Sequence, residues 1–204
     1  MNQFRNFAII SALLIGGLAV AHADPISGTL SAFGTDTFTA STITFTNPGQ
    51  INGGSGSRSG SFTILTDGNP VTFFPGLVGA LPYTQGTNEV PPGGSIDAFT
   101  TTEDGVTFTF TLDLYTAAYG DLPGCTAHAV CLDITGMGIW SGTGFTSSPG
   151  SFTLSDQLVN GQTTTTYSAS AIATAAPVPE PASLALFGTG LLGVVAFARR
   201  RFSV

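Results

Sequence analysis

Apolar and polar residues alternate along much of the middle of the chain. The clearest run covers residues 106–115. One of its faces carries Val106, Phe108, Phe110, Leu112 and Leu114, and the other carries Thr107, Thr109, Thr111, Asp113 and Tyr115. A period of two residues predicts a β-strand with one buried face. Shorter runs of this kind occur at residues 26–33, 37–45, 61–65, 71–74, 96–101, 131–135, 151–154 and 163–172.

Turn-forming residues separate these runs, and no amphipathic helix competes with them. The predicted turns lie at residues 47–49, 67–70, 103–105 and 160–161, and residues 50–60 and 84–94 are predicted to be surface loops. Eight or nine strands with one buried face predict an all-β fold, an antiparallel β-sandwich over residues 24–176. A single-sheet solenoid is the alternative, although no repeat of fixed period supports it.

The first 23 residues have the pattern of a signal peptide. Arg5 precedes an apolar stretch at residues 7–20, and Ala21, His22 and Ala23 form a small-x-small cleavage site. We therefore expect the mature chain to begin at Asp24 and to be exported. An uncleaved N-terminal anchor is the alternative interpretation.

A second apolar stretch lies near the carboxyl end. Residues 182–198 carry no charge and would form a helix of about 25 Å, marginally enough to cross a membrane. Arg199, Arg200 and Arg201 follow, and such a cluster holds its end of a span on the cytoplasmic side. Pro179 and Pro181 disfavour helix before the stretch, so Glu180 is expected in extended, accessible backbone.

These residues resemble the PEP-CTERM sorting signal of Gram-negative bacteria that produce exopolysaccharide. The likeness covers residues 178–201, with Val178, Pro179, Glu180 and Pro181 as its signature, Gly188 and Gly190 within the apolar stretch, and the three arginines as its stop. It implies that residues 177–204 form a sorting segment cut by an exosortase, a membrane enzyme. The precursor would be anchored in the inner membrane, and its product delivered to the periplasm, cell surface or extracellular matrix. The same module is also labelled in connection with ice-binding proteins. An ordinary single-pass anchor is the alternative.

Charge in the predicted body is strongly one-sided. Between residues 24 and 176 Arg58 is the one basic residue, whereas all twelve acidic residues of the chain lie between Asp24 and Glu180. Such a body repels nucleic acid and anionic lipid. The acids at predicted turns could bind calcium, but no calcium-binding motif is present, and we expect solvated turn residues instead. The candidate calcium ligands are Asp67, Asn69, Asp97, Glu103, Asp104 and Asp121.

Two cysteines, Cys125 and Cys131, enclose five residues. An even number of cysteines in an exported chain predicts a local disulfide. The alternative is a metal site made by both cysteines and His128, which would lack a nearby fourth ligand.

We expect no catalytic residues and no cofactor. His128 is the one histidine of residues 24–176, lysine is absent, and no nucleophile, metalloprotease or phosphate-binding motif occurs. Glu89, Glu103 and Asp104 are the candidates for a glycosidase pair, but residues 103–105 read better as a hairpin turn.

The favoured hypothesis is an exported, non-enzymatic structural or interaction protein of the envelope or the extracellular polysaccharide matrix. A carbohydrate-binding module or weak glycoside hydrolase is the alternative, and it requires an exposed row of aromatic rings from the set Tyr83, Tyr115, Tyr119 and Trp140. Ice binding is a further alternative. It would use the threonine rows Thr42, Thr44, Thr46 and Thr107, Thr109, Thr111.

Overall fold

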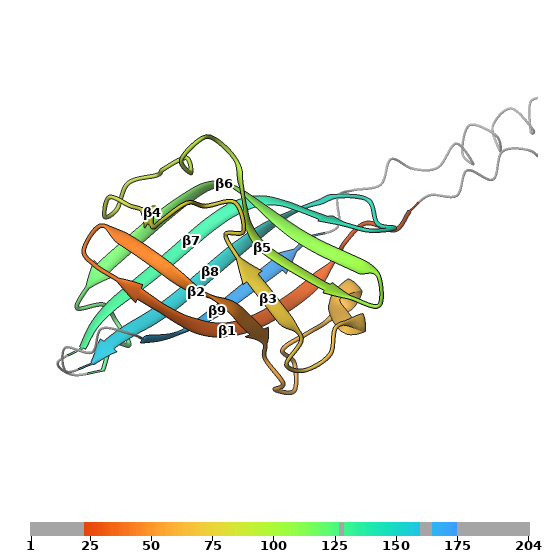
Figure 1. The fold of residues 1–204 in the computed structure, drawn as a ribbon, viewed down its shortest axis with the longest axis horizontal. Helices are drawn as coiled ribbons and strands as arrows, with labels where there is room; N and C mark the ends of the chain where they lie inside the picture. The colour runs from red at the N-terminus through yellow and green to blue at the C-terminus, as the bar shows by residue number, and fades with distance from the viewer. Residues whose placement is uncertain (1–22, 127–128, 160–164, 175–204) are drawn as a thin grey trace, which may run out of the picture.

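A computed structural model describes residues 23–126, 129–159 and 165–174 (Figure 1). Apart from one short 3-10 helix, η1 (Gly60–Ile64), the elements of this part of the chain are strands. They are β1 (Gly28–Phe38), β2 (Thr42–Ile51), β3 (Pro70–Phe73), β4 (Leu81–Pro82), β5 (Ile96–Glu103), β6 (Val106–Gly120), β7 (Ala129–Gly142), β8 (Ser148–Val159) and β9 (Thr165–Ala173). The expected leader and the expected span at residues 182–198 lie outside the described residues, among which no helix is long and apolar enough to cross a membrane.

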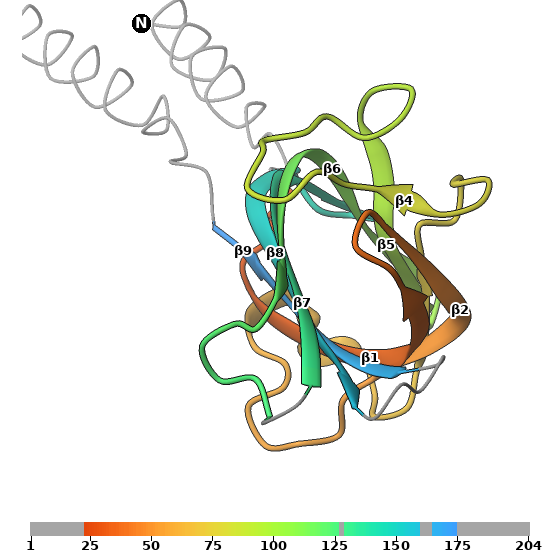
Figure 2. The same ribbon diagram turned by 90° about the vertical axis from the view of Figure 1, so that its left-hand side faces the viewer.

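The strands form one closed antiparallel barrel and not a sandwich. Each of β5 to β8 pairs with the next strand along the chain, β3 pairs with β2 and β5, and β9 returns to pair with β1. Because β1 also pairs with β2, the sheet closes on itself (Figure 2). The all-β, antiparallel prediction is confirmed, but the sandwich prediction is wrong. Alternation specifies which side of each strand is buried, and it carries no information about whether the first and last strands meet.

Two short segments complete the wall where β3 and β5 do not reach. Strand β4 pairs with Thr42 and Ile43 at the start of β2, whereas β3 pairs with Gly49 and Gln50 at its end. Between these pairings the side-chain amide of Asn47 donates to the carbonyl of Phe73 and accepts from its amide. Residues 85–89 lie along the second half of β6 and bond to its backbone. Residues 47–49, which were predicted to form a turn, lie within β2.

A β-bulge corrects part of the predicted pattern in β6. Phe108, Phe110 and Leu112 point into the barrel and are fully buried, as predicted. The pairing with β7 shifts by one residue between Leu112 and Leu114. An extra residue at this point reverses the alternation. Tyr115 is therefore buried, and Leu114 lies on the outer wall, the opposite of the prediction.

Aromatic side chains fill the barrel around Trp140, which is fully buried. Its ring centroid lies 4.8 Å from that of Phe62, 5.2 Å from that of Phe110 and 5.6 Å from that of Phe99. Gly150 faces the indole, and a Cβ there would lie 2.4 Å from Cδ1 of Trp140. These rings come from η1, β6, β5 and β7, so the core connects opposite parts of the wall.

Residues 61–65 form no strand, contrary to the prediction. They belong mainly to η1, which places the buried ring of Phe62 in the aromatic core. The segment before η1 crosses the start of β1 closely: a Cβ on Gly28 would lie 2.1 Å from the carbonyl oxygen of Ser59, and Gly28 has a φ of 127°. Glycine is required here because no side chain fits between the two backbones.

The described body begins and ends at the same end of the barrel, which we call the base (Figure 1). The backbone amide of Thr146 donates to the carbonyl of Asp24, and the amide of Thr174 donates to the carbonyl of Pro149. Both partners belong to the β7–β8 hairpin. The turn between β1 and β2 and the loop between β6 and β7 lie at the opposite end, which we call the far end.

Candidate functional site

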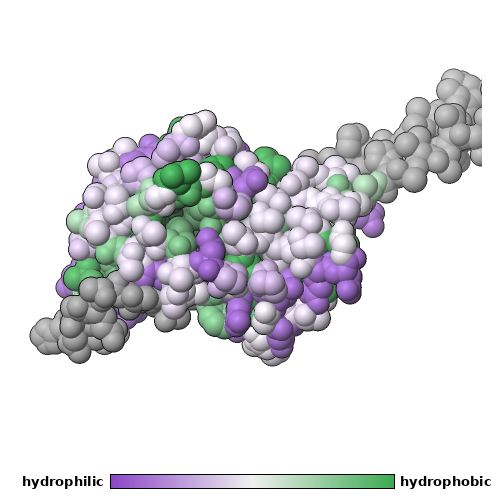
Figure 3. Space-filling view, in the orientation of Figure 1, coloured by the Kyte–Doolittle hydropathy of each residue, from purple (hydrophilic) through white to green (hydrophobic). Residues whose placement is uncertain are grey.

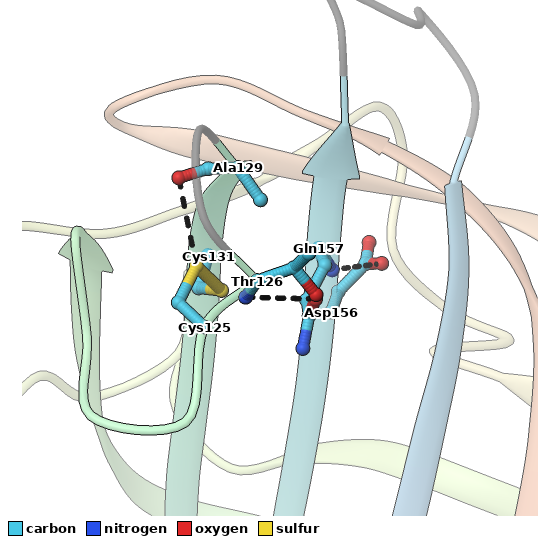
Figure 4. The surroundings of a disulfide bond; sticks show 6 residues. All are labelled: Cys125, Thr126, Ala129, Cys131, Asp156 and Gln157. Carbon is cyan, nitrogen blue, oxygen red and sulfur yellow. Dashed lines mark hydrogen bonds between the residues drawn. A yellow bond between two sulfur atoms is a disulfide. The ribbon is translucent and has the colours of Figure 1, made fainter.

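A disulfide joins Cys125 and Cys131 at the far end, which confirms the predicted bridge (Figure 4). The Cα atoms are 6.0 Å apart, and the bridge ties the β6–β7 loop to the first residues of β7. Both sulfur atoms are bound to each other, so neither can act as the thiolate that the alternative metal site needs. His128 lies outside the described residues. In the part of the chain that the structure describes, no three His, Cys, Asp or Glu side chains gather.

A polar hollow of about 510 Å³ lies beside this bridge. Residues of the β6–β7 loop form one side, and Asp133, Ser155 and Gln157 on the outer wall of β7 and β8 form the other. The side-chain oxygen of Gln157 accepts hydrogen bonds from the amide and the hydroxyl of Thr126, the latter at 2.7 Å (Figure 4). Those two bonds fix the loop above the wall. Among the described residues that line the hollow, none is aromatic.

The four candidate aromatic residues, Tyr83, Tyr115, Tyr119 and Trp140, do not form an exposed row. Tyr83, Tyr115 and Trp140 are buried, and half-buried Tyr119 packs edge-on against Phe38. The hydroxyl of Tyr83 donates to the carbonyl of Thr39. The three tyrosines pack at the far end, whereas Trp140 packs toward the base, where it is paired with Ser148 at the start of β8.

Burial also raises the pKa of both buried tyrosines far above the ordinary value. For Tyr83 desolvation is the main cause, followed by the negative charges that Tyr119 and Asp36 can carry nearby. For Tyr115 desolvation is again the main cause, and a hydrogen bond of 3.1 Å to Glu89 adds to it. Both phenols are therefore protonated at all physiological pH values.

The three proposed glycosidase carboxylates do not come together. Glu89 pairs with Tyr115 in β6, whereas Glu103 pairs with Val106 at the opposite end of that strand. Nine residues of extended strand separate these positions, roughly 30 Å. Glu103 accepts bonds from the amide and hydroxyl of Thr66, and Asp104 occupies the β5–β6 turn with a φ of 49°. The predicted hairpin turn at residues 103–105 is confirmed.

The proposed calcium ligands of the body also have structural partners. Asp67 forms an ion pair with Arg58, and Asp97 accepts a hydrogen bond of 2.9 Å from Thr111. The side chain of Asn69 donates to Thr101 at 2.7 Å. The turn with Asp67 and Asn69 lies beside Glu103, but among the described residues no three side chains gather that could hold a metal ion.

Two carboxylates inside the barrel were not anticipated. Asp36 on β1 and Asp156 on β8 are almost completely buried, and Oδ1 of Asp156 accepts a hydrogen bond of 2.6 Å from the amide of Gln157. A sequence signal for them exists: Asp36 follows Ala32 at the inward spacing of β1, and Asp156 follows Leu154 at that of β8. The burial of these two acids could therefore be predicted from their place in the alternating pattern of the strand, but not from their residue type.

The two threonine rows lie on the outer wall, each paired with a neighbouring strand. Thr44 and Thr46 face Thr37 and Thr35 across the β1–β2 pair. The second row, on β6, faces β5, where the hydroxyls of Thr107 and Thr102 bond to each other at 2.8 Å. Both rows therefore follow a curved barrel wall. In the second row the hydroxyl of Thr107 already has a hydrogen-bond partner on the neighbouring strand.

The base holds the residues of the predicted leader cleavage site that the structure describes. The hydroxyl of Thr146 donates to the carbonyl of Ala23 at 2.8 Å, and its amide donates to the carbonyl of Asp24. Ala21 lies outside the described residues, as do the predicted sorting residues 178–181 and the arginine cluster 199–201. The last described residue, Thr174, bonds to Pro149 through both its amide and its hydroxyl.

Comparison with known families identifies the segment that follows the barrel. Residues 177–201 match the family model of the PEP-CTERM protein-sorting motif. The chain carries a PEP-CTERM sorting signal. The match covers the PEP-CTERM tail alone, and it confirms the resemblance drawn from the sequence. No curated protein and no solved structure matches the chain, so the barrel must be interpreted from its own residues.

Proposed function

We propose that the chain is the precursor of an exported, non-enzymatic barrel protein that an exosortase-like membrane protease cuts at the PEP-CTERM tail. A leader is removed after Ala23, residues 182–198 hold the precursor in the inner membrane, and the arginines at 199–201 keep its end in the cytoplasm. The observation that carries this proposal is the order of the parts. The barrel makes its last described contact at Thr174, and the matched sorting motif begins at residue 177.

The released barrel acts as a structural or interaction component of the envelope or of the extracellular polysaccharide. Its chemistry supports this role, because the candidate carboxylates bond within the barrel or in its turns and the large aromatic side chains fill the core. The outer wall carries rows of threonine, and Arg58 is paired with Asp67. A wall of hydroxyl groups and acidic side chains is soluble and suits a hydrated polymer matrix. The buried aromatic rings give no support to sugar stacking.

Replacing Glu180 with alanine, or the three terminal arginines with alanine, tests the processing step. Either change should leave uncut precursor in the membrane fraction, because the first removes the acid of the recognised triplet and the second removes the charges that position the apolar span, and with it the triplet, at the membrane enzyme. Asp121→Asn is the matched control, since Asp121 is an exposed acid of the barrel. Mass spectrometry of the exported product locates the cut. Release of either variant at the wild-type rate, or an exported product that still ends at Val204, would refute the proposal.

A further inference from the structure

Three of the largest exposed apolar side chains gather on the outer wall beside the point where the body ends. Met137, Ile139 and Ile172 are 62%, 42% and 46% exposed, and we call them the exit patch. Met137 faces Ser151 across the β7–β8 pair, and Ser151 faces Ile172 across the β8–β9 pair. Directly opposed side chains lie about 5 Å apart, so Met137 and Ile172 lie within roughly 10 Å of each other.

The exit patch adjoins the end of the barrel directly. Ile172 stands two residues before Thr174, and Ile139 faces Pro149, the residue whose carbonyl accepts both hydrogen bonds from Thr174. The patch also continues into a hollow of about 230 Å³ on the outer wall. Leu114 and Met137 line that hollow together with other residues of β6, β7 and β8 and with Asn88 of the loop before β5. An apolar surface with an adjacent hollow is typical of a protein contact.

Glu180 comes six residues after Thr174, so the two can be at most about 20 Å apart. A protease that encloses the Pro179-Glu180-Pro181 triplet must therefore stand close to the base of the barrel. The exit patch lies at that position, because Ile172 belongs to the strand that ends just before Thr174 and Ile139 is paired with Pro149, to which Thr174 bonds. Because the exit patch lies beside the start of the tail, a protein bound to the tail could also contact the patch.

The charge around the patch favours a protein over a lipid surface. The strand neighbours and cross-strand partners of Met137, Ile139 and Ile172 are neutral. Surfaces that bind membranes combine apolar residues with Lys or Arg, which anionic headgroups attract. The barrel offers only Arg58, and that residue is paired with Asp67. An anionic bilayer would repel the acidic body.

We propose that the exit patch is a docking surface for the exosortase-like protease, which it holds beside the tail during cleavage. This inference rests on the proposed function and adds a second recognition element, on the folded body, to the triplet itself. Docking raises the effective concentration of the protease at the triplet. The protease would then recognise the folded barrel as well as the tail.

The test uses the full-length precursor with Met137→Thr, Ile139→Thr and Ile172→Thr combined. Threonine keeps the preference for strand while removing apolar area. The matched control is Val78→Thr with Val90→Thr, which removes two exposed apolar side chains, 99% and 62% exposed, from loops near β4. Figure 3 shows hydrophobic surface in that region of the barrel. An unchanged thermal midpoint and unchanged resistance to chymotrypsin, which cuts after the aromatic residues that fill the core, show that each variant is folded.

Cleavage is followed in membranes that contain the protease and again after they are dissolved in detergent. We expect the exit-patch variant to be cut about tenfold more slowly in both, as expected when contact residues of an interface are lost, and the control at the wild-type rate. Cleavage of the exit-patch variant at the wild-type rate would overturn the inference while leaving the processing proposal intact. A defect that disappears in detergent would assign the patch to the lipid surface and overturn it as well. If the wild-type precursor itself is not cut, both proposals fail.

Discussion

Replacement of Trp140 tests whether the ring contacts at the centre of the barrel hold its wall together. Trp140→Ala should lower the free energy of unfolding by about 3–5 kcal/mol, because it removes a fully buried indole and its contacts with Phe62, Phe99 and Phe110. For a domain of this size that loss lowers the melting temperature by roughly 10 °C. Trp140→Phe keeps a ring and should cost roughly 1–2 kcal/mol.

The measurement is urea unfolding of the exported protein, followed by circular dichroism. Fluorescence serves only for the wild type, because Trp140 is the single tryptophan of the chain. Val78→Ala is the control and should change stability by less than about 0.5 kcal/mol, since that side chain is almost fully exposed. If Trp140→Ala unfolds within about 1 kcal/mol of the wild type, the ring cluster does not stabilise the closed barrel and the argument from its contacts is wrong.

The remaining predictions concern the far end of the barrel. Replacing Cys125 and Cys131 with serine should cost about 2 kcal/mol from the lost loop-closure entropy, and urea unfolding with and without reductant measures it; equal midpoints would contradict the expectation. Stability should fall as the pH rises above about 10, because unfolding lets Tyr83 and Tyr115 ionise at their ordinary pKa whereas the folded state keeps them protonated. The stabilisation from these two groups is thus complete below pH 10 and is lost in alkali. Titration by phenolate absorbance should show Tyr83 and Tyr115 ionising only on unfolding, and Tyr83→Phe should flatten the alkaline decline.

Local patterns predicted the strands well where each strand is regular. Residues 71–74, 96–101 and 151–154 all lie mainly or wholly in strands, as their alternation indicated. The predicted strand at residues 37–45 was wrong because it ran through a turn: Thr39 bonds to Thr42, and the hairpin reverses there. Threonine fits both strand and turn, so residue type alone did not mark the reversal.

Features that depend on distant residues were not predictable from local patterns. The bulge in β6 that turns Tyr115 inward arises from pairing with β7, and closure arises from pairing of Gly28 with Ala173. Phe62 was assigned to a strand because its alternation resembles one, although the core it enters is made by rings from other elements. The tail was recognised because its signal is contained in one continuous segment.

Closure by the last strand also determines when the barrel can fold during export. Strand β1 needs β9 as its partner along nearly its whole length, and some 140 residues separate the paired positions Gly28 and Ala173. A polypeptide that crosses the membrane amino end first therefore cannot complete its ring until Ala173 has emerged. The matched sorting motif begins only four residues later, at residue 177, so ring closure and emergence of the sorting motif become nearly simultaneous events.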